Sequence, residues 1–379
     1  MAGVLATPAI ACGQDRLLAD RLIQAIQTQM AALPAGPVLL SSFLVDTGPN
    51  ASDFDLTQSN AAYIYDNALA GLALLAAGDR AGAARIGSAL AMAQAHDRFW
   101  KDGRLRNAYQ AGGMAVPAKL PGWWDGNAKA WREDPYQVGS QSGPIAWAML
   151  LWAALGQTGP ANLAAAWLDD QLRAKTGYYG GFYGFEPGPT KLMWQSTEQN
   201  IDLTVAFQKL GRTEDAQHAR DFVRSMFDTS AGLFGTGVAP DGTTNRLLAA
   251  DAGIWPYLAG LGSSLSAKTA INKLLRGRGL GFSSVSQGIW LEGTAFAWLA
   301  LRSQSTKIAS QFAVTLVQNI SPSGYVYATV APSLSTGFAV GPSAQPNAAP
   351  VQFNYYRRPA LAPTAWAAMA ALDVNPLAG

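Results

Sequence analysis

The sequence predicts an all-α protein built as an (α/α)6 toroid, in which six outer helices surround a ring of six inner helices. Apolar residues recur with the period of a helix over twelve segments of the chain. Along the chain, segments that are apolar on nearly all sides alternate with segments that carry Arg, Lys and Asp on one side. A helix that is apolar all round must be enclosed by others, whereas an amphipathic helix faces solvent. The alternation therefore predicts two concentric rings.

In chain order, the expected helices cover residues 14–33, 61–77, 79–97, 142–155, 160–174, 197–210, 213–228, 251–261, 266–277, 291–303, 306–319 and 361–373. The inner ones start near 61, 142, 197, 251, 291 and 361. At two junctions a Gly ends one helix and Asp79 or Thr213 begins the next, which is typical of tight αα-hairpins. An open α-solenoid would require a more regular repeat length, so the uneven spacing favours a closed toroid.

Long segments rich in Gly, Pro, Trp and Tyr precede the inner helices, at 98–141, 175–196, 229–250, 279–290 and 320–360. Each leads to the N-terminal end of an inner helix, so all of them should emerge on one rim. Short hairpins are expected within "GYYGGFYGF" and "GYVYATV". Loops of this length in a compact domain are usually functional, which places the expected cleft at this rim.

Composition excludes several classes of function. The net charge of +2 is not concentrated in a basic run, so nucleic acid is not an expected partner. Cys12 is the only cysteine and there are two histidines, so we expect no disulfide, no metal site and no cofactor. The 12 tryptophans, in contrast, suit a protein that stacks aromatic rings on sugars.

The N-terminus contains a short apolar stretch that ends in an A-x-A pattern, Ala9-Ile10-Ala11. We interpret residues 1–11 as the remnant of an export signal, although an ordinary frayed terminus explains them too. No apolar run reaches the roughly 18 residues of a membrane span. We therefore expect residues 1–12 to lie outside the fold, and residues 13–379 to form one catalytic domain of an exported, periplasmic or extracellular monomer.

Acidic residues stand where the inner helices begin. Asp66, Asp251 and Glu292 lie at three of these starts, and Glu198 and Asp202 lie together at a fourth. Helix-dipole or capping interactions explain many acids in first turns, Asp66 and Asp251 among them. They do not explain Glu198 and Asp202, which are four residues apart and so share one face of a largely apolar helix. We expect these carboxyls to face the cleft.

Carboxyl groups beside aromatic rings suit glycoside hydrolysis, in which one carboxylic acid protonates the leaving oxygen and a second carboxylate activates water or attacks the sugar. Glu198 is the expected general acid, and Asp66, Asp251 or Glu292 the base. Asp202 would orient Glu198 or bind a sugar hydroxyl. The expected substrate-binding residues are Trp123, Trp124, Asp125, Trp131, Glu133, Asp134, Tyr136, Gln141, Trp194, Asn200, Trp255, Trp290, Tyr356 and Arg357. Neither a Ser-His-Asp hydrolase nor a phosphate-binding loop is supported, because His96 and His218 fall on outer helices and the loop motifs are missing.

The ordered motifs "YDNALA", "DGRLRNAY", "PGWWD", "EDPYQVGSQSG", "STEQNIDL", "DAGIWP" and "WLEGTA" resemble the six-hairpin (α/α)6-toroid glycosidase superfamily. More narrowly, they are similar to secreted bacterial hydrolase-like proteins associated with exopolysaccharide or cellulose-type synthesis, over about residues 38–373. This resemblance implies a glycosidase acting on a polysaccharide or oligosaccharide without fixing the sugar. His commonly stands in that pattern where this chain has Gln199, so an acid–imidazole pair does not carry over.

Two other functions remain open from the sequence. A polysaccharide lyase would need a Tyr or His base and a cation to neutralise a uronate, for which Tyr136 or Tyr355 with Arg357 would serve. Arg106 and Arg358 could also meet an acidic sugar. A non-catalytic glycan-binding or assembly protein would use the same cleft without turnover.

Overall fold

The computed structural model describes residues 13–48, 51–304, 307–341 and 351–378. The expected export-signal remnant, together with Cys12, lies outside these residues. Within the described ranges, no helix combines the length and the apolar character that a membrane crossing requires.

The predicted, mostly helical class is confirmed. All twelve expected helices are present, with ends within about three residues of the prediction. The helices are α1 (Gly13–Ala31), α2 (Asp53–Gln58), α3 (Ile64–Ala76), α4 (Arg80–Ala95), α5 (Ser142–Leu155), α6 (Thr158–Leu172), α7 (Thr197–Lys209), α8 (Thr213–Ser225), α9 (Ala250–Leu258), α10 (Ser264–Leu274), α11 (Leu291–Leu301), α12 (Lys307–Gln318) and α13 (Leu361–Ala371), with a 3-10 turn at Arg302–Gln304. The short α2 was not expected; a capping box between Ser52 and Asp55 starts it.

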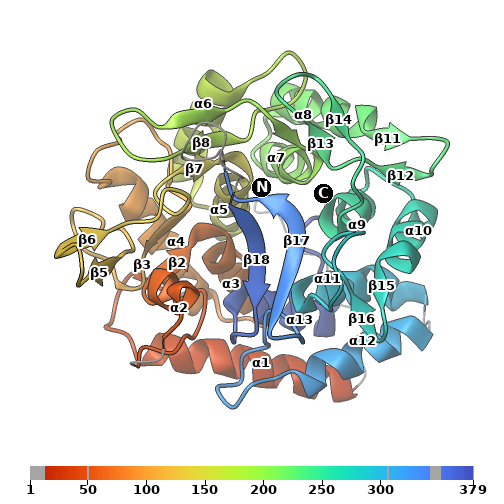
Figure 1. The fold of residues 1–379 in the computed structure, drawn as a ribbon, viewed down its shortest axis with the longest axis horizontal. Coiled ribbons are helices and arrows are strands. Elements are labelled where there is room, and N and C mark those ends of the chain that lie inside the picture. Colours follow the sequence, from red (N-terminus) through yellow and green to blue (C-terminus); the bar gives the residue numbers. More distant parts are fainter. Residues whose placement is uncertain (1–12, 49–50, 305–306, 342–350, 379) are drawn as a thin grey trace.

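Six of these helices form an inner ring (Figure 1). Each of α3, α5, α7, α9 and α11 contacts the next in this series, and α13 contacts both α11 and α3. Outside them, α4, α6, α8, α10 and α12 each pack against the inner helix that precedes them in the chain. The remaining outer helix, α1, packs against α13, so the first and last long helices form the closing pair.

Backbone hydrogen bonds connect the starts of the inner helices into a circle. The first residue of each inner helix donates its N–H to a carbonyl in another rim segment: Ile64 to Asn107, Ser142 to Gly180, Thr197 to Thr236, Ala250 to Phe282, Leu291 to Ala328 and Leu361 to Ser42. These N–H groups have no partner within their own helix, so the rim segments satisfy them. Because Leu361 bonds back to Ser42, the rim closes on itself.

The rim carries small antiparallel sheets of two or three strands. The strands are β1 (Val38–Leu39), β2 (Ala61–Tyr63), β3 (Ala108–Gln110), β4 (Gly112–Gly113), β5 (Trp123–Asp125), β6 (Ala130–Arg132), β7 (Ser140–Gln141), β8 (Gly181–Tyr183), β9 (Thr190–Leu192), β10 (Gln195–Ser196), β11 (Phe227–Asp228), β12 (Leu233–Phe234), β13 (Gly237–Val238), β14 (Thr244–Asn245), β15 (Leu275–Arg276), β16 (Gly279–Leu280), β17 (Ser333–Ala339) and β18 (Gln352–Tyr356). The helix expected from residue 61 starts at Ile64 because residues 61–63 pair with β3 as strand β2.

Both segments that were expected to form hairpins take part in local antiparallel pairing. The "GYYGGFYGF" segment contributes β8, which pairs with β9. The "GYVYATV" segment turns back on the residues just before it: Val326 bridges Ile320, and the N–H groups of Ser321 and Tyr327 donate to the carbonyls of Tyr325 and Asn319. Tyr327 and Thr329 also make isolated bridges to distant residues, Pro359 and Trp290.

The β17–β18 hairpin crosses the middle of the ring in Figure 1, over the end where the inner helices begin. Its Tyr355 ring lies 5.7 Å from Trp290 and 6.0 Å from Phe282, measured between ring centroids. Arg358, just after β18, forms an ion pair with Asp55 of α2. These contacts attach the β18 side of the hairpin to the rim.

Candidate active site

Carboxyl groups from four inner helices converge beneath the β17–β18 hairpin. Glu198, Asp251 and Glu292 are each the second residue of their helix, and Asp66 is the third residue of α3. The charge at Glu292 interacts with those of the other three. Solvent accessibility is small, at 8% for Asp66, 9% for Asp251 and 3% for Glu292, while Glu198 is partly exposed. The helix starts, brought together by the closed rim, thus form one acidic cluster.

Asp202 lies one helical turn below Glu198 and is fully buried. Neither of its carboxyl oxygens has a hydrogen-bond partner among the described residues. It lies against Gly143 of α5, where an added Cβ would come 3.2 Å from its Oδ2. The indole N–H of Trp147 lies near the Asp202 carboxyl and slightly favours its ionised form, but it makes no hydrogen bond to it. An anion is costly in this position, so Asp202 is held as a neutral acid.

No basic side chain in the described residues forms an ion pair with any of the five carboxyls. Burial raises the pKa of Asp66 to about 7. Burial, reinforced by the charge of Asp251, raises the pKa of Glu198 to about 8. Burial raises the pKa of Asp251 itself only to about 6, because backbone N–H groups stabilise its anion. For Asp202 and Glu292, burial and then the neighbouring carboxylates raise the pKa well above its usual range.

Glu292 is held by a hydrogen-bond chain that crosses the ring. The indole Nε1–H of Trp366 on α13 donates to Tyr65 Oη over 3.0 Å. The Tyr65 hydroxyl, on α3, donates in turn to Glu292 Oε1 on α11. The desolvated Tyr65 hydroxyl beside Glu292 has a pKa raised well above its usual range, so it stays a donor.

Below the carboxyls, aromatic rings fill the centre of the inner ring. Trp147, Trp255 and Trp366 come from α5, α9 and α13, and their ring centroids lie 5.6 to 5.7 Å apart. Phe296 of α11 packs against two of them. Trp255, which the sequence suggested as a sugar platform, is 2% exposed in this layer. Its place is therefore the floor beneath the cluster.

Tyrosines form the walls above this floor. Tyr63, Tyr65, Tyr136 and Tyr355 are each partly exposed, and the rings of Tyr63 and Tyr136 lie 6.1 Å apart. Burial and then the Glu292 charge raise the pKa of Tyr355 well above its usual range. The sequence indicated Tyr136 as a substrate contact and Tyr355 only as a lyase base, and it missed Tyr63 and Tyr65. Their signal was the spacing in "YIYDN", which places both next to Asp66.

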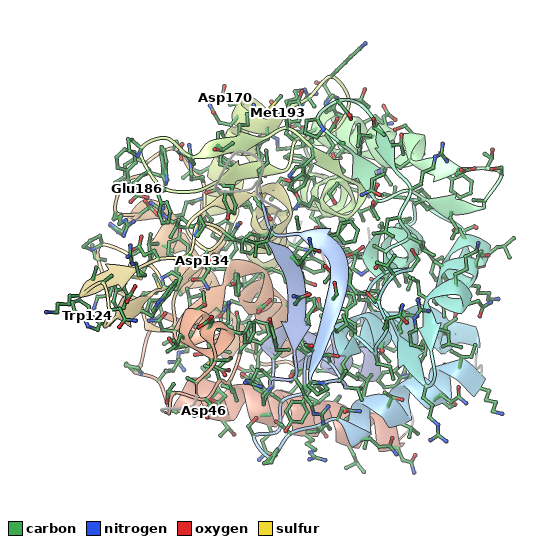
Figure 2. All side chains as sticks on the ribbon, viewed as in Figure 1. Asp46, Trp124, Asp134, Asp170, Glu186 and Met193 are labelled. Carbon is green, nitrogen blue, oxygen red and sulfur yellow. The ribbon has the colours of Figure 1, made fainter. Side chains whose placement is uncertain are left out.

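The Trp-rich segment does not join the cluster. Trp123, Trp124, Asp125 and Trp131 form the β5–β6 hairpin, in which Trp124 pairs across from Trp131. Figure 2 shows Trp124 at the outer edge of the molecule, away from the centre of the ring. Trp124 and Trp131 are 63% and 48% exposed. Asp125 caps the hairpin turn by accepting backbone N–H groups.

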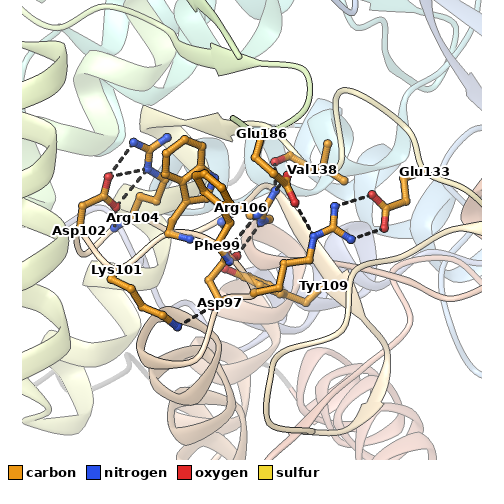
Figure 3. A network of polar contacts seen from close by, with 12 residues as sticks. Asp97, Phe99, Lys101, Asp102, Arg104, Arg106, Tyr109, Glu133, Val138 and Glu186 are labelled. Atoms are coloured by element: carbon orange, nitrogen blue, oxygen red, sulfur yellow. Dashed lines mark hydrogen bonds and ion pairs between the residues drawn. The ribbon is translucent and has the colours of Figure 1, made fainter. Parts of the chain in front are cut away.

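Glu133 belongs to an ionic network that is exposed at Arg98 and buried at Arg106 (Figure 3). Both of its carboxyl oxygens accept from Arg98, at 2.6 and 2.7 Å, and Arg98 also bonds Glu186. The fully buried Arg106 forms ion pairs with Asp97 and Glu186. This network fastens the 98–141 segment to the 175–196 segment, and it occupies both arginines.

Asp134 and Gln141 lie closer to the cluster, in structural positions. Asp134 accepts the backbone N–H groups of Tyr136 and Gln137, and burial raises its pKa. Gln141 is the N-cap residue of α5 and is 5% exposed. Trp194 covers Gly180 with its ring and remains partly exposed, four residues before Glu198.

Asn200 has a structural role that the sequence did not indicate. As the fourth residue of α7, it accepts the Tyr178 N–H and donates to the Tyr178 carbonyl, fastening a rim segment to the helix. The fourth residues of three other inner helices, Asn67, Thr294 and Thr364, accept rim N–H groups in the same way. This repeated position forms part of the closed rim.

Trp290, Tyr356 and Arg357 complete the sequence-predicted set. Trp290 is the N-cap residue of α11 and lies under Tyr355. The Tyr356 ring packs on Phe54. The guanidinium of Arg357 donates to the Asn319 side chain and to the carbonyls of residues 329 and 330. These contacts leave Tyr356 and Arg357 outside the acidic cluster.

No family model matches the chain, and no curated protein matches its sequence. Among solved structures, a glycosidase in complex with glucose has a TM-score of 0.60 at 12% identity, covering 96% of this chain and 99% of that one. A D-mannose isomerase has a TM-score of 0.60 at 10% identity, covering 97% and 98%. A cellobiose 2-epimerase from Spirochaeta thermophila has a TM-score of 0.56 at 13% identity, covering 96% and 98%. The chain thus shares its mostly helical fold over nearly its full length with these enzymes.

Proposed function

We propose that the chain is an (α/α)6-toroid glycoside hydrolase that cleaves an exopolysaccharide or an oligosaccharide at the acidic cluster under the β17–β18 hairpin. The observation that carries the proposal is the pair Glu198 and Asp251. Their carboxyls interact, with a pKa of about 8 for the first and about 6 for the second. Two neighbouring carboxyls with separated pKa values supply an acid and a base at the same pH.

Between these values Glu198 is protonated and Asp251 is ionised. Glu198 would give its proton to the glycosidic oxygen as the bond to the sugar carbon breaks. Asp251 would take a proton from the water that attacks this carbon, so that one water is consumed for each bond cleaved. The tyrosine hydroxyls of the walls can bind sugar hydroxyls, and the buried Asp202 supports Glu198 from below.

Several observations favour hydrolysis over the other sugar chemistries. A lyase needs a cation beside the uronate carboxylate, and Arg106, Arg357 and Arg358 are all engaged elsewhere. Isomerisation and epimerisation remove a proton from carbon, for which His is the commonest base. His96 is exposed at the end of α4, and His218 donates to carbonyls near residue 177. Neither contacts the cluster.

Support also comes from the neighbours in fold, several of which are named as glycosidases, and one as an α-amylase from Clostridium perfringens. The sequence resemblance to secreted hydrolase-like proteins extends the proposal to an exported, monomeric enzyme of the bacterial envelope.

A glycan screen with identified products tests this function, using wild type, Glu198→Gln and Asp251→Asn. Loss of an acid or base should lower turnover by about 10²–10⁴-fold, with glycan binding retained. Glu214→Gln is the matched control, because Glu214 is an exposed first-turn acid of the outer helix α8. Full activity of Glu198→Gln would refute the assigned acid. Products with the absorbance of an unsaturated sugar would show a lyase, and binding without any turnover would show a non-catalytic protein.

A further inference from the structure

The two oxygens of Glu292 are not equivalent, because only Oε1 accepts a hydrogen bond from a side chain of another inner helix. Oε1 accepts the Tyr65 hydroxyl, whereas Oε2 has no hydrogen-bond partner from the protein among the described residues. The direction of the chain is fixed at its far end. An indole N–H can only donate, so Tyr65 Oη must accept from Trp366 and direct its own proton to Glu292.

The surroundings of Glu292 disfavour a negative charge. Its side chain is 3% exposed, no basic group pairs with it, and the charges of Asp66, Asp251 and Glu198 all oppose its ionisation. Burial of a carboxyl without a cation favours its neutral form. If Glu292 holds a proton, we expect that proton on Oε2, because the carbonyl oxygen of a carboxylic acid is the stronger acceptor and Oε1 accepts the Tyr65 hydroxyl.

From this arrangement we propose that Glu292 binds substrate as a neutral carboxylic acid, donating from Oε2 to a sugar oxygen, with Tyr65 and Trp366 as its positioning residues. The inference rests on the proposed function for the identity of the ligand, and it assigns to Glu292 a binding role that differs from that of the base. The glycan oxygen it contacts must be an acceptor, such as a hydroxyl or a ring oxygen.

The protonation state can be tested without any substrate. Difference infrared spectroscopy of wild type against Glu292→Gln at pH 7 should show the loss of one carboxylic-acid C=O band. The loss of a carboxylate band instead would overturn the proposal. Because this measurement needs no turnover, it stands even if the proposed hydrolysis is not found.

The binding role is tested with two substitutions at the same site and with cellotetraose and maltotetraose as probes. In Glu292→Gln the amide oxygen can accept from Tyr65 while the NH₂ group donates in place of Oε2. We expect this variant to keep kcat/KM within about tenfold of wild type, and Glu292→Leu to lose about 10²-fold, mostly through KM. A loss in Glu292→Gln as large as that in Glu198→Gln would show that Glu292 works as an anion.

Tyr65→Phe tests the positioning role. It should raise KM by about three- to tenfold in wild type and have no further effect in the Glu292→Leu background, since the two side chains act as a unit. Additive losses in KM would contradict a role through Glu292. Thermal unfolding of each variant separates these effects from misfolding. If neither probe is turned over, the same comparison is made on Kd by calorimetry, and failure of hydrolysis is then distinct from failure of this inference.

Discussion

Asp66→Asn should make the protein more stable at neutral and alkaline pH. The pKa of Asp66 is about 7 in the folded protein against 3.8 for the unperturbed side chain, and burial is the main cause. Each pH unit of such a difference corresponds to about 1.36 kcal/mol, so ionised Asp66 costs about 4 kcal/mol in the folded state. A neutral Asn removes this cost, but an amide group whose hydrogen bonds are incomplete itself destabilises the folded state by about 1 kcal/mol. The expected net gain is about 3 kcal/mol.

The sign of the pH dependence follows from proton binding. Between pH 3.8 and about 7 the folded state holds the Asp66 proton more tightly than the unfolded state does. Stability of the wild type therefore falls as pH rises through this window and is constant above it with respect to this group. The advantage of Asp66→Asn should be full at pH 8 and should shrink towards zero as the pH approaches about 4.

Urea unfolding of wild type and Asp66→Asn at pH 4.5, 6 and 8 measures this difference in the free energy of unfolding. Glu214→Gln serves as control, because removing an exposed first-turn acid should cost only about 0.3–1 kcal/mol. A lower stability of Asp66→Asn at pH 8, or a gain that does not change with pH, would refute the reasoning. A stabilising substitution at an acid is expected where the acid serves function rather than stability.

Three further predictions concern the ionic network, the α5–α7 contact and the acid. Arg106→Met should lower the free energy of unfolding by about 3–5 kcal/mol at pH 7, because it leaves the buried Asp97 without its cation. Arg106 holds the pKa of Asp97 below its usual range, so this loss of stability should become smaller towards pH 4. An unchanged midpoint in urea unfolding would disprove the prediction. Gly143→Ala should destabilise the protein by about 1–3 kcal/mol, since the new Cβ would lie 2.8 Å from a side-chain carbon of α7. Gly159→Ala, which has open space around it, should stabilise the helix by up to about 1 kcal/mol. Equal changes of the thermal unfolding temperature in the two variants would contradict this difference. Turnover should fall above about pH 8 as Glu198 loses its proton, and a pH–rate profile that is flat to pH 10 would argue against it as the acid.

The helices could be predicted from the sequence because their information is local. The 3.6-residue period, the Gly residues at junctions and the near absence of charge in alternate segments are all present within single stretches of chain. The start of α3 could not be predicted in this way. Residues 61–63 are as apolar as the helix that follows, and only their pairing with β3, nearly fifty residues away, makes them a strand.

Among the candidate site residues too, the sequence revealed those whose signal is local and missed those that depend on tertiary contacts. Acids at the second position of an inner helix were visible, because few other charges stand in those apolar segments. The tryptophans of the β5–β6 hairpin were equally conspicuous, yet the structure places this hairpin, with Trp124, at the outer edge of the molecule. Tyr65 was overlooked because a tyrosine in a helix is usually core, and its partners Glu292 and Trp366 lie more than 200 residues away.

By itself, the sequence determined which segments are enclosed helices, which helices carry acids, and that these acids stand at helix starts. The tertiary structure decided that the starts meet. Ring closure through α13 and α3, with the backbone bond from Leu361 to Ser42, brings four helices' carboxyls into one desolvated cluster. Desolvation and mutual repulsion exist only once the charges are brought together, so the raised pKa values of Glu198 and Glu292 belong to the assembled ring and not to any segment of the chain.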